Sequence, residues 1–296
     1  MRAMSGRVWV VGSLNVDRPW RVERHPAVGE TVVGSMLDPV PGGKGLNEAV
    51  AAARSRDVPF SVLLVGTVGD DNDGSWLKIT AQDSDVDDEG VLKHPDLPTG
   101  SALIVVADDG ANTVTVSAGA NAATVWPDVR LRPDDVVCAQ LEVPVETVAA
   151  ALLAAHEAGA RSVLNPSPIG LGVSLVPSAD VVVVNEHEAA QLTGFDGDPL
   201  AQAQAIRTGD QIVVVTLGSD GVVSSGPSGD HVVPGIAVHA VDTTGAGDCF
   251  LGVLAASLAD GMDLLPALER ANLAASIAVT RPGAVDAMPH AAELLD

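Results

Sequence analysis

Short apolar runs rich in β-branched residues alternate with segments of helical length along most of the chain. The expected strands read as continuous apolar runs, the pattern of strands buried on both faces of a sheet; they are Val8–Gly12, Val62–Gly66, Val136–Ala139, Ser162–Leu164, Val181–Val184 and Ile212–Leu217. The expected helices are Lys44–Arg54, Val145–Ala158, His187–Thr193, Leu200–Arg207, Ala246–Ala259 and Leu264–Thr280. Because this alternation requires right-handed βαβ crossovers, we expect an α/β fold with a doubly wound, mainly parallel sheet flanked by helices.

Two regions interrupt this alternation, and neither carries a helical pattern. Residues 18–40 hold extended stretches separated by proline and glycine, and residues 101–118 form an expected hairpin that turns at Asp108–Asn112. We expect the two regions to form a small antiparallel β-sheet that stands off the main domain and serves as a lid. The rest of the chain, residues 1–17, 41–100 and 119–296, is then the large α/β domain.

The composition argues against several classes of partner. The formal net charge of −23 repels nucleic acid and anionic lipid, so we expect neither as a partner. No stretch of about 20 apolar residues is free of charges, so we expect no membrane span. The cysteines, Cys138 and Cys249, form no CxxC pair, and without a leader-like segment they indicate a reducing cytoplasm.

The motif with the clearest chemistry is DTTGAGDCF, residues 242–250. It follows an expected β run, Ile236–Val241, and opens a helix, so Gly245-Ala246-Gly247 leave backbone amides bare at the positive end of the helix dipole. Asp248 lies beside this anion hole, where a carboxylate can accept the proton of a hydroxyl that attacks a phosphoryl group. The alternative is an acidic residue that only stabilises a helix start, and taken alone this is the commoner case.

Two further motifs carry polar groups beside tight glycines or at a strand end. In PGGKGLN, residues 41–47, the glycines let the backbone approach a ligand closely, while Lys44 and Asn47 are suited to hydroxyls. In GSLNVD, just past the first strand, Asn15 and Asp17 point to the same side of an extended segment, as vicinal sugar hydroxyls require. Neither motif is a Walker A loop or a dinucleotide fingerprint, and a plain turn before a helix explains the first equally well.

Two segments allow two interpretations each. Asn185–Glu188 follows the strand Val181–Val184 and fits either a helix N-cap with an acidic first turn or a metal–nucleotide contact at a strand end. Thr216–Gly221 follows the next strand and fits either a nucleotide-binding segment or a hairpin turn. Spacing alone does not decide between them.

Together these residues resemble the PfkB carbohydrate kinase family, and within it the ribokinases most closely. The resemblance rests on GGKGLN at 42–47 and DTTGAGD at 242–248, two specific motifs that stand in the family's order. It runs from Val8 to Pro289, and Gly119–Ala123 and Asn165-Pro166 are also similar to ribokinases.

The resemblance implies ATP-dependent phosphoryl transfer to a primary hydroxyl of a sugar, converting ribose to ribose 5-phosphate, in a cytoplasmic enzyme. It also implies Mg²⁺ and K⁺ as cofactors beside ATP, and a homodimer formed through the lid. The alternatives are a PfkB kinase for another sugar or a nucleoside, and a protein that binds sugar or nucleotide without catalysis.

The resemblance assigns a role to each matching residue. Asp248 would be the catalytic base, and the amides of Gly245, Ala246 and Gly247 the anion hole. The sugar would be bound by Asn15, Asp17, Gly43, Lys44, Asn47 and Glu142 together with Asp248. The nucleotide would be bound by Asn185, Thr216, Gly218, Ser219, Gly221, Gly247 and Asn272. Glu188 would be linked to magnesium, and a monovalent cation would be held, mostly through carbonyls, by Asp242, Thr244, Ala278, Arg281 and Gly283.

Two positions depart from the family's pattern. Ala287 stands where the family often supplies a serine hydroxyl near the monovalent cation, so we expect weakened potassium activation. Leu46 stands where ribokinases usually carry a small residue, and we expect its bulk to narrow or reshape the sugar pocket.

Overall fold

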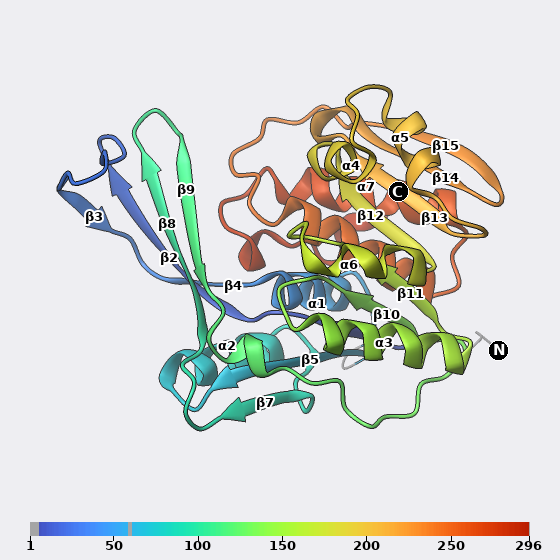
Figure 1. Ribbon diagram of the computed structural model, residues 1–296, viewed down its shortest axis with the longest axis horizontal. Coiled ribbons are helices and arrows are strands. Elements are labelled where there is room, and N and C mark those ends of the chain that lie inside the picture. The colour runs from blue at the N-terminus through green and yellow to red at the C-terminus, as the bar shows by residue number, and fades with distance from the viewer. Residues whose placement is uncertain (1–5, 59–60, 296) are drawn as a thin grey trace.

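A ten-stranded sheet forms the centre of the computed structural model, which describes residues 6–58 and 61–295 (Figure 1). β1 (Val8–Val11) pairs in parallel with β10 (Val136–Ala139) on one side and β5 (Val62–Gly69) on the other. Beyond β10 lie the parallel strands β11 (Arg161–Leu164), β12 (Val181–Asn185) and β13 (Ile212–Thr216), then the antiparallel strands β14 (Gly221–Gly226) and β15 (Gly229–Pro234). The short strands β6 (Val86–Asp87) and β7 (Val91–His94) pair with β5.

Each buried strand contributes to two cores, because successive side chains of a strand point to opposite faces of the sheet. In β1, Val8 and Val10 join one core, and Trp9 and Val11 join the other. The first core is covered by α1 (Lys44–Arg54), α2 (Asn72–Gln82), α6 (Ala246–Ala259) and α7 (Leu264–Ala278). The second is covered by α3 (Val145–Ala158), α4 (Glu186–Thr193) and α5 (Pro199–Ile206). The expected doubly wound, mainly parallel sheet is therefore confirmed.

A second, smaller sheet projects from this body, as Figure 1 shows at its left. It consists of β2 (Asn15–Val22), β3 (Gly34–Met36), β4 (Val40–Gly42), β8 (Gly100–Ala107) and β9 (Asn112–Ser117). The pairings of β2 with β3 and β4 and of β8 with β9 are antiparallel, as expected, whereas β2 and β8 pair in parallel. The small sheet begins at Asn15 rather than Arg18, so Asn15 and Asp17 belong to the root of its longest strand pair.

Some expectations about local structure are wrong. Ile236–Val241 forms no strand; all of its residues are exposed, and most of the apolar ones line a cavity described below. Helix α2 has no strong apolar stripe and was not expected, although Asp71 caps it by accepting a hydrogen bond from the Gly74 amide. The hairpin β14–β15 was also missed, because its glycines and serines weaken the strand pattern. Among the described helices, none is long and apolar enough to cross a membrane.

Candidate active site

The first turn of α1 is locked against the segment that follows β1. Gly43 has φ +93°, and a Cβ there would lie 2.7 Å from the Asn15 nitrogen and 2.8 Å from the Ser13 carbonyl oxygen, so only glycine fits. The Leu46 amide also donates to the Ser13 carbonyl over 3.1 Å. The GGKGLN motif therefore brings Lys44 and Asn47 beside the start of β2.

The N-terminus of α6 meets α1 at this point. Gly245 caps the helix with φ +73°, and a Cβ there would lie 2.8 Å from the Ala284 Cβ, so a second glycine is fixed by geometry. At Gly247, by contrast, a Cβ would meet nothing within 4 Å, so the space above the first turn is open. Amides of a first helical turn lack intrahelical acceptors and favour an anion. Of the three amides expected to be bare, that of Ala246 donates to the Thr243 carbonyl over 3.2 Å, so the expectation of a bare amide at Ala246 is wrong.

Asp248 is held by two side chains of α1. Asn47 Nδ2 donates to Asp248 Oδ2 over 2.7 Å, and Lys44 Nζ lies 3.6 Å from Asp248 Oδ1. The Asp248 side chain is 13% exposed, so its carboxylate faces the site rather than bulk solvent. The charge of Asp248 raises the pKa of Lys44 above its usual range, which keeps the ammonium charged at any working pH. The two motifs that carry the family resemblance thus converge on one carboxylate.

Two more carboxylates share this cluster. Glu142 Oε2 accepts hydrogen bonds from Ser13 Oγ and, over 3.4 Å, from the Lys44 amide. Asp17 lies over Gly42, and its pKa is raised to about 7 by burial and by the negative charges of Glu142 and Asp248. Asp17, Glu142 and Asp248 are therefore close enough to interact, and Lys44 supplies the positive charge between them.

Asn15 occupies the base of the cluster and depends on a residue that sequence reasoning did not assign. Asn15 is buried, and its Oδ1 accepts a hydrogen bond of 2.8 Å from Asn121 Nδ2. Asn121 also bonds both backbone polar groups of Leu14, at 2.9 and 3.1 Å. Asn121 lies in the short turn η1 (Gly119–Ala123), the stretch that is similar to ribokinases, and this similarity was its only signal.

A cavity of about 580 Å³ lies on the other side of the α6 N-terminus. It is lined by the β13–β14 turn, by the exposed segment 236–240 and by residues of α6 and α7. All of the expected nucleotide residues except Asn185 line it: Thr216, Gly218, Ser219, Gly221, Gly247 and Asn272. Thr216–Gly221 is the hairpin turn between β13 and β14 and also lines this cavity, and its role in nucleotide binding stays a prediction.

Asn185 and Glu188 instead form a reciprocal cap at the start of α4. Asn185 Oδ1 accepts from the Glu188 amide, and Glu188 Oε2 accepts from the Asn185 amide, both over 2.9 Å. Asn185 therefore does not line the cavity, although its Cα pairs with that of Thr216, which does. Within residues 6–58 and 61–295, no group of three or more histidine, cysteine or acidic side chains is arranged to hold a metal ion.

The residues expected around a monovalent cation come from two segments, the loop before α6 and the end of α7 with the turn that follows it. Asp242 accepts hydrogen bonds of 2.9 Å from the amides of Thr244 and Gly283. Burial disfavours the Asp242 charge, but these bonds outweigh it and hold the pKa below its usual value. The Arg281 guanidinium pairs with Glu293, and the Arg281 amide donates to the Ala278 carbonyl over 3.0 Å.

Leu46 does not narrow the pocket. Its side chain is fully buried in the core between α1 and the sheet, so its bulk points away from the polar cluster. The expectation of a reshaped sugar pocket was wrong because a helix residue two positions after Lys44 faces another side of the helix. Ala287 is buried as well, at 1% exposure.

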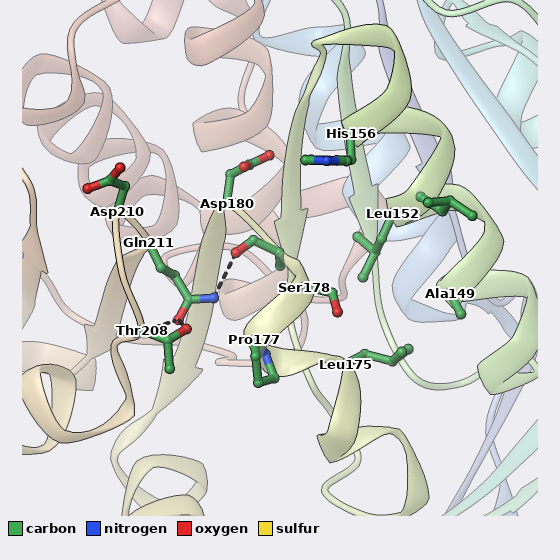
Figure 2. Close-up of a pocket in the computed structure, with 12 residues that line it drawn as sticks. Ala149, Leu152, His156, Leu175, Pro177, Ser178, Asp180, Thr208, Asp210 and Gln211 are labelled. Carbon is green, nitrogen blue, oxygen red and sulfur yellow. Dashed lines mark hydrogen bonds between the residues drawn. The ribbon is translucent and has the colours of Figure 1, made fainter.

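Another hollow lies at the amino ends of the interior strands β12 and β13 (Figure 2). Its volume is about 490 Å³, and it is lined by α3, by η2 (Leu171–Ser178) and by the residues just before β12 and β13. There Gln211 Nε2 donates to the Val176 and Ala179 carbonyls, each over 2.7 Å. Ligands of open α/β sheets bind at the carboxyl ends of the strands, and this hollow faces the amino ends.

Comparisons with known proteins agree with this geometry. The family model described as pfkB family carbohydrate kinase matches residues 5–291. The chain belongs to this family. A ribokinase of Bacillus subtilis is 35% identical over 288 residues, which cover 95% of this chain and 96% of that protein.

Two solved structures extend the comparison. The structure of an Arabidopsis thaliana ribokinase complexed with ribose and ATP has a TM-score of 0.87 and 29% identity, and 98% of each chain is covered. A Vibrio cholerae fructokinase in its fructose, ADP and calcium ion bound form has a TM-score of 0.80 and 27% identity, again with 98% of each chain covered. This pfkB family member is therefore a carbohydrate kinase.

Proposed function

We propose that this carbohydrate kinase transfers the γ-phosphoryl group of ATP to the primary hydroxyl of ribose. The observation that carries the proposal is the position of the α6 N-terminus. Gly247 lines the nucleotide-sized cavity, and the next residue, Asp248, lies in the polar cluster with Asn47 and Lys44. One helical turn therefore borders both the place for ATP and the place for an acceptor.

Each group then has a defined task in the transfer. Asp248 accepts the proton of the attacking hydroxyl as the new O–P bond forms, and the bond from the γ-phosphorus to ADP breaks. The first-turn amides of α6 stabilise the transferring phosphoryl group, since they need no reorganisation as its charge is redistributed. Asn47 and Lys44 orient the Asp248 carboxylate, while Asn15, Asp17 and Glu142 offer acceptors to the sugar hydroxyls.

Ribose is the preferred acceptor in this proposal because relatives in Schizosaccharomyces pombe and Bacillus subtilis, 34% and 35% identical, are named ribokinases. Fructose is the second candidate, since a fructokinase crystallised with fructose shares the fold over nearly the whole chain. A nucleoside acceptor, and binding without catalysis, are the remaining alternatives.

Mg²⁺ would arrive with the nucleotide. The described residues offer no cage of acidic ligands, and Mg²⁺ in kinases is held by one or two carboxylates together with substrate phosphates. Glu188 is the acidic residue proposed near Mg²⁺, and Asp242 is the one proposed near the monovalent cation. Mg²⁺ would offset the charge of the phosphates.

A monovalent cation fits the Asp242 loop in its donor chemistry. The loop offers backbone carbonyls and a carboxylate whose pKa is lowered, and the guanidinium of Arg281 is bound to Glu293. We propose K⁺ activation that is weakened by Ala287, and Ala287→Ser is expected to strengthen it.

The small sheet carries exposed apolar side chains on an edge strand. Val114 and Val116 lie on one face of the edge strand β9 and are 53% and 54% exposed. Exposed apolar side chains on an edge strand favour association. We propose a homodimer formed through this sheet; Val114→Asp with Val116→Asp should yield monomers in light scattering, whereas Thr113→Asp with Thr115→Asp on the opposite face should not.

The function is tested by an assay of ADP release with Mg-ATP, using ribose, deoxyribose, fructose and several nucleosides, with and without K⁺. Turnover on ribose above all other acceptors supports the proposal, and turnover on fructose or a nucleoside replaces the substrate but keeps the mechanism. A folded protein that binds ATP but phosphorylates none of these acceptors would refute the kinase reaction.

We also place the enzyme in the cytoplasm, because both described cysteines are free and buried.

A further inference from the structure

A fourth carboxyl group lies beneath the active site, and the mechanism above does not use it. Glu48 belongs to α1, directly after Asn47, and its side chain is fully buried. It points to the end of β10, where Glu48 Oε2 accepts hydrogen bonds from Gln140 Nε2 and, over 3.3 Å, from Cys138 Sγ. Buried carboxyl groups are rare unless they are paired with a cation or kept neutral.

The atoms without partners indicate where a proton belongs. Glu48 Oε1 and Gln140 Oε1 are both buried and lack hydrogen-bond partners among the described residues. Two unprotonated oxygens cannot bond each other, but a proton on Glu48 Oε1 turns it into a donor for the Gln140 carbonyl oxygen. One proton would therefore satisfy both atoms and close a two-bond pair between an acid and an amide.

The surroundings of Glu48 favour the protonated form. The titratable groups that face it are Cys138 of β10, Lys44 of α1 and Asp248 of α6. Burial and the negative charge of Asp248 raise the pKa of Glu48 well above its usual value, although Lys44 opposes them. Lys44 is already shared by the other carboxylates of the site, so it is not free to neutralise Glu48.

The pair connects three segments that carry sugar-facing residues. Glu48 lies one turn after Lys44 on α1, and Gln140 lies two residues before Glu142. Gln140 Oε1 also lies against Gly12, at a place where a Cβ would clash, and Gly12 directly precedes Ser13, which bonds Glu142. On the other side, the Glu48 carbonyl oxygen packs against Gly252 of α6.

We propose that Glu48 is a positioning residue for the phosphoryl transfer: as a neutral acid bonded to Gln140, it holds α1 and the loops after β1 and β10 in register beneath the acceptor. This rests on the proposed function. Its neutrality matters because a fourth negative charge beside Asp17, Glu142 and Asp248 would repel the ATP phosphates and the developing charge of the attacking oxygen.

Three substitutions separate charge from geometry. Glu48→Gln keeps the shape and both hydrogen bonds to Gln140, so kcat and the acceptor KM should stay close to those of the unmodified enzyme. Glu48→Leu removes both bonds, and we expect kcat/KM for the acceptor to fall about tenfold to a hundredfold while the KM for ATP changes little, because the displaced loops face the sugar and not the cavity. Glu146→Gln, an exposed carboxyl at the start of α3, is the control and should change neither constant.

The protonation state has a readout that needs no activity. The infrared difference between the unmodified protein and Glu48→Gln at pH 7 should contain the carbonyl band of a protonated carboxylic acid, and the same difference for Glu146→Gln should lack it. Absence of the Glu48 band would overturn the proposal, as would equal losses in Glu48→Gln and Glu48→Leu, or unchanged kinetics in Glu48→Leu. If no acceptor is phosphorylated at all, the proposed function fails. The infrared band and calorimetric ribose binding by the two Glu48 variants then still test whether Glu48 is neutral and positions the acceptor site.

Discussion

Acceptor binding should release a proton near neutral pH, because Asp17 has a pKa of about 7. Burial and the charges of Glu142 and Asp248 hold the proton on Asp17 in the free enzyme. Sugar hydroxyls donate more strongly to a carboxylate than to a neutral acid, so the sugar should bind the ionised form. A carboxyl with this pKa is about one-tenth ionised at pH 6 and about nine-tenths ionised at pH 8.

The expected magnitude is therefore an acceptor KM that falls about tenfold between pH 6 and pH 8, with little change in the KM for ATP. Calorimetry in two buffers of different ionisation enthalpy measures the proton released at pH 6. Asp17→Asn should bind the sugar more weakly and show no such trend in KM. A constant acceptor KM across this range in the unmodified enzyme, with no proton release, would show that Asp17 is ionised before the sugar binds.

The same shift affects stability with a defined sign. The folded-state pKa of about 7 lies above the ordinary value of 3.8, so the folded protein holds this proton more tightly than the unfolded chain does. The contribution to the free energy of unfolding is complete below pH 3.8 and is lost as the pH rises through 7. In urea titrations, Asp17→Asn should remove that decline while leaving the decline from other groups.

Three further predictions concern the base, the anion hole and the scaffold. Asp248→Asn should lower kcat roughly a hundredfold or more without changing ATP binding, because the amide cannot accept the proton, and near-normal turnover would remove Asp248 from this role. Gly245→Ala should destabilise the protein by about 1–3 kcal/mol in urea titrations, since alanine at φ +73° also meets Ala284, and an unchanged midpoint would contradict this. Asp135 is fully buried and paired with Arg7 at 2.6 Å, so Asp135→Ala should cost about 3–5 kcal/mol. Burial alone would raise the pKa of Asp135, but the hydrogen bonds from Arg7 keep it low. The contribution of Asp135 to the free energy of unfolding is therefore present at neutral pH and is lost as the pH falls through the lowered pKa. Acid unfolding of Asp135→Ala with the same pH dependence as the parent would refute this.

The main sheet could be predicted from the sequence because its strands are buried on both faces. Continuous runs such as Val181–Val184 have few alternatives to a central parallel strand, and most of their ends were wrong by at most one residue. The exception is β5, which continues to Gly69, three residues beyond the expected end at Gly66. Ile236–Val241 misled because apolar residues also line ligand cavities, and a cavity wall has the composition of a strand without its pairing. Such a segment can be told apart from a strand only when the surrounding segments have been placed in three dimensions.

Some features of the candidate site could likewise be predicted from the sequence, and others could not. Glycines such as Gly43 and Gly245 could be recognised in the motifs, since only glycine readily adopts their backbone conformations. The bond between Asn47 and Asp248 joins residues 201 positions apart, and no local pattern specifies it. The contacts of Asn121, for which family similarity was the only signal, and the raised pKa of Asp17 could not be predicted for the same reason, because both depend on which groups the fold brings within a few ångströms.

The parallel pairing of β2 with β8 determines how the small sheet can move. The two strands leave the body side by side and stay in register from Asn15 opposite Gly100 to Val22 opposite Ala107. Because the small sheet is attached to the body through two adjacent strands, it can tilt about a line that crosses both of them. It resists twisting, because twisting would shear the hydrogen bonds between β2 and β8. Asn15 is the first paired residue of β2 and is bonded to Asn121 of the body, whereas Trp20 lies further out along the small sheet. We therefore expect tilting to sweep the outer sheet through a wide arc while the residues at its root, which we propose to contact the acceptor, scarcely shift.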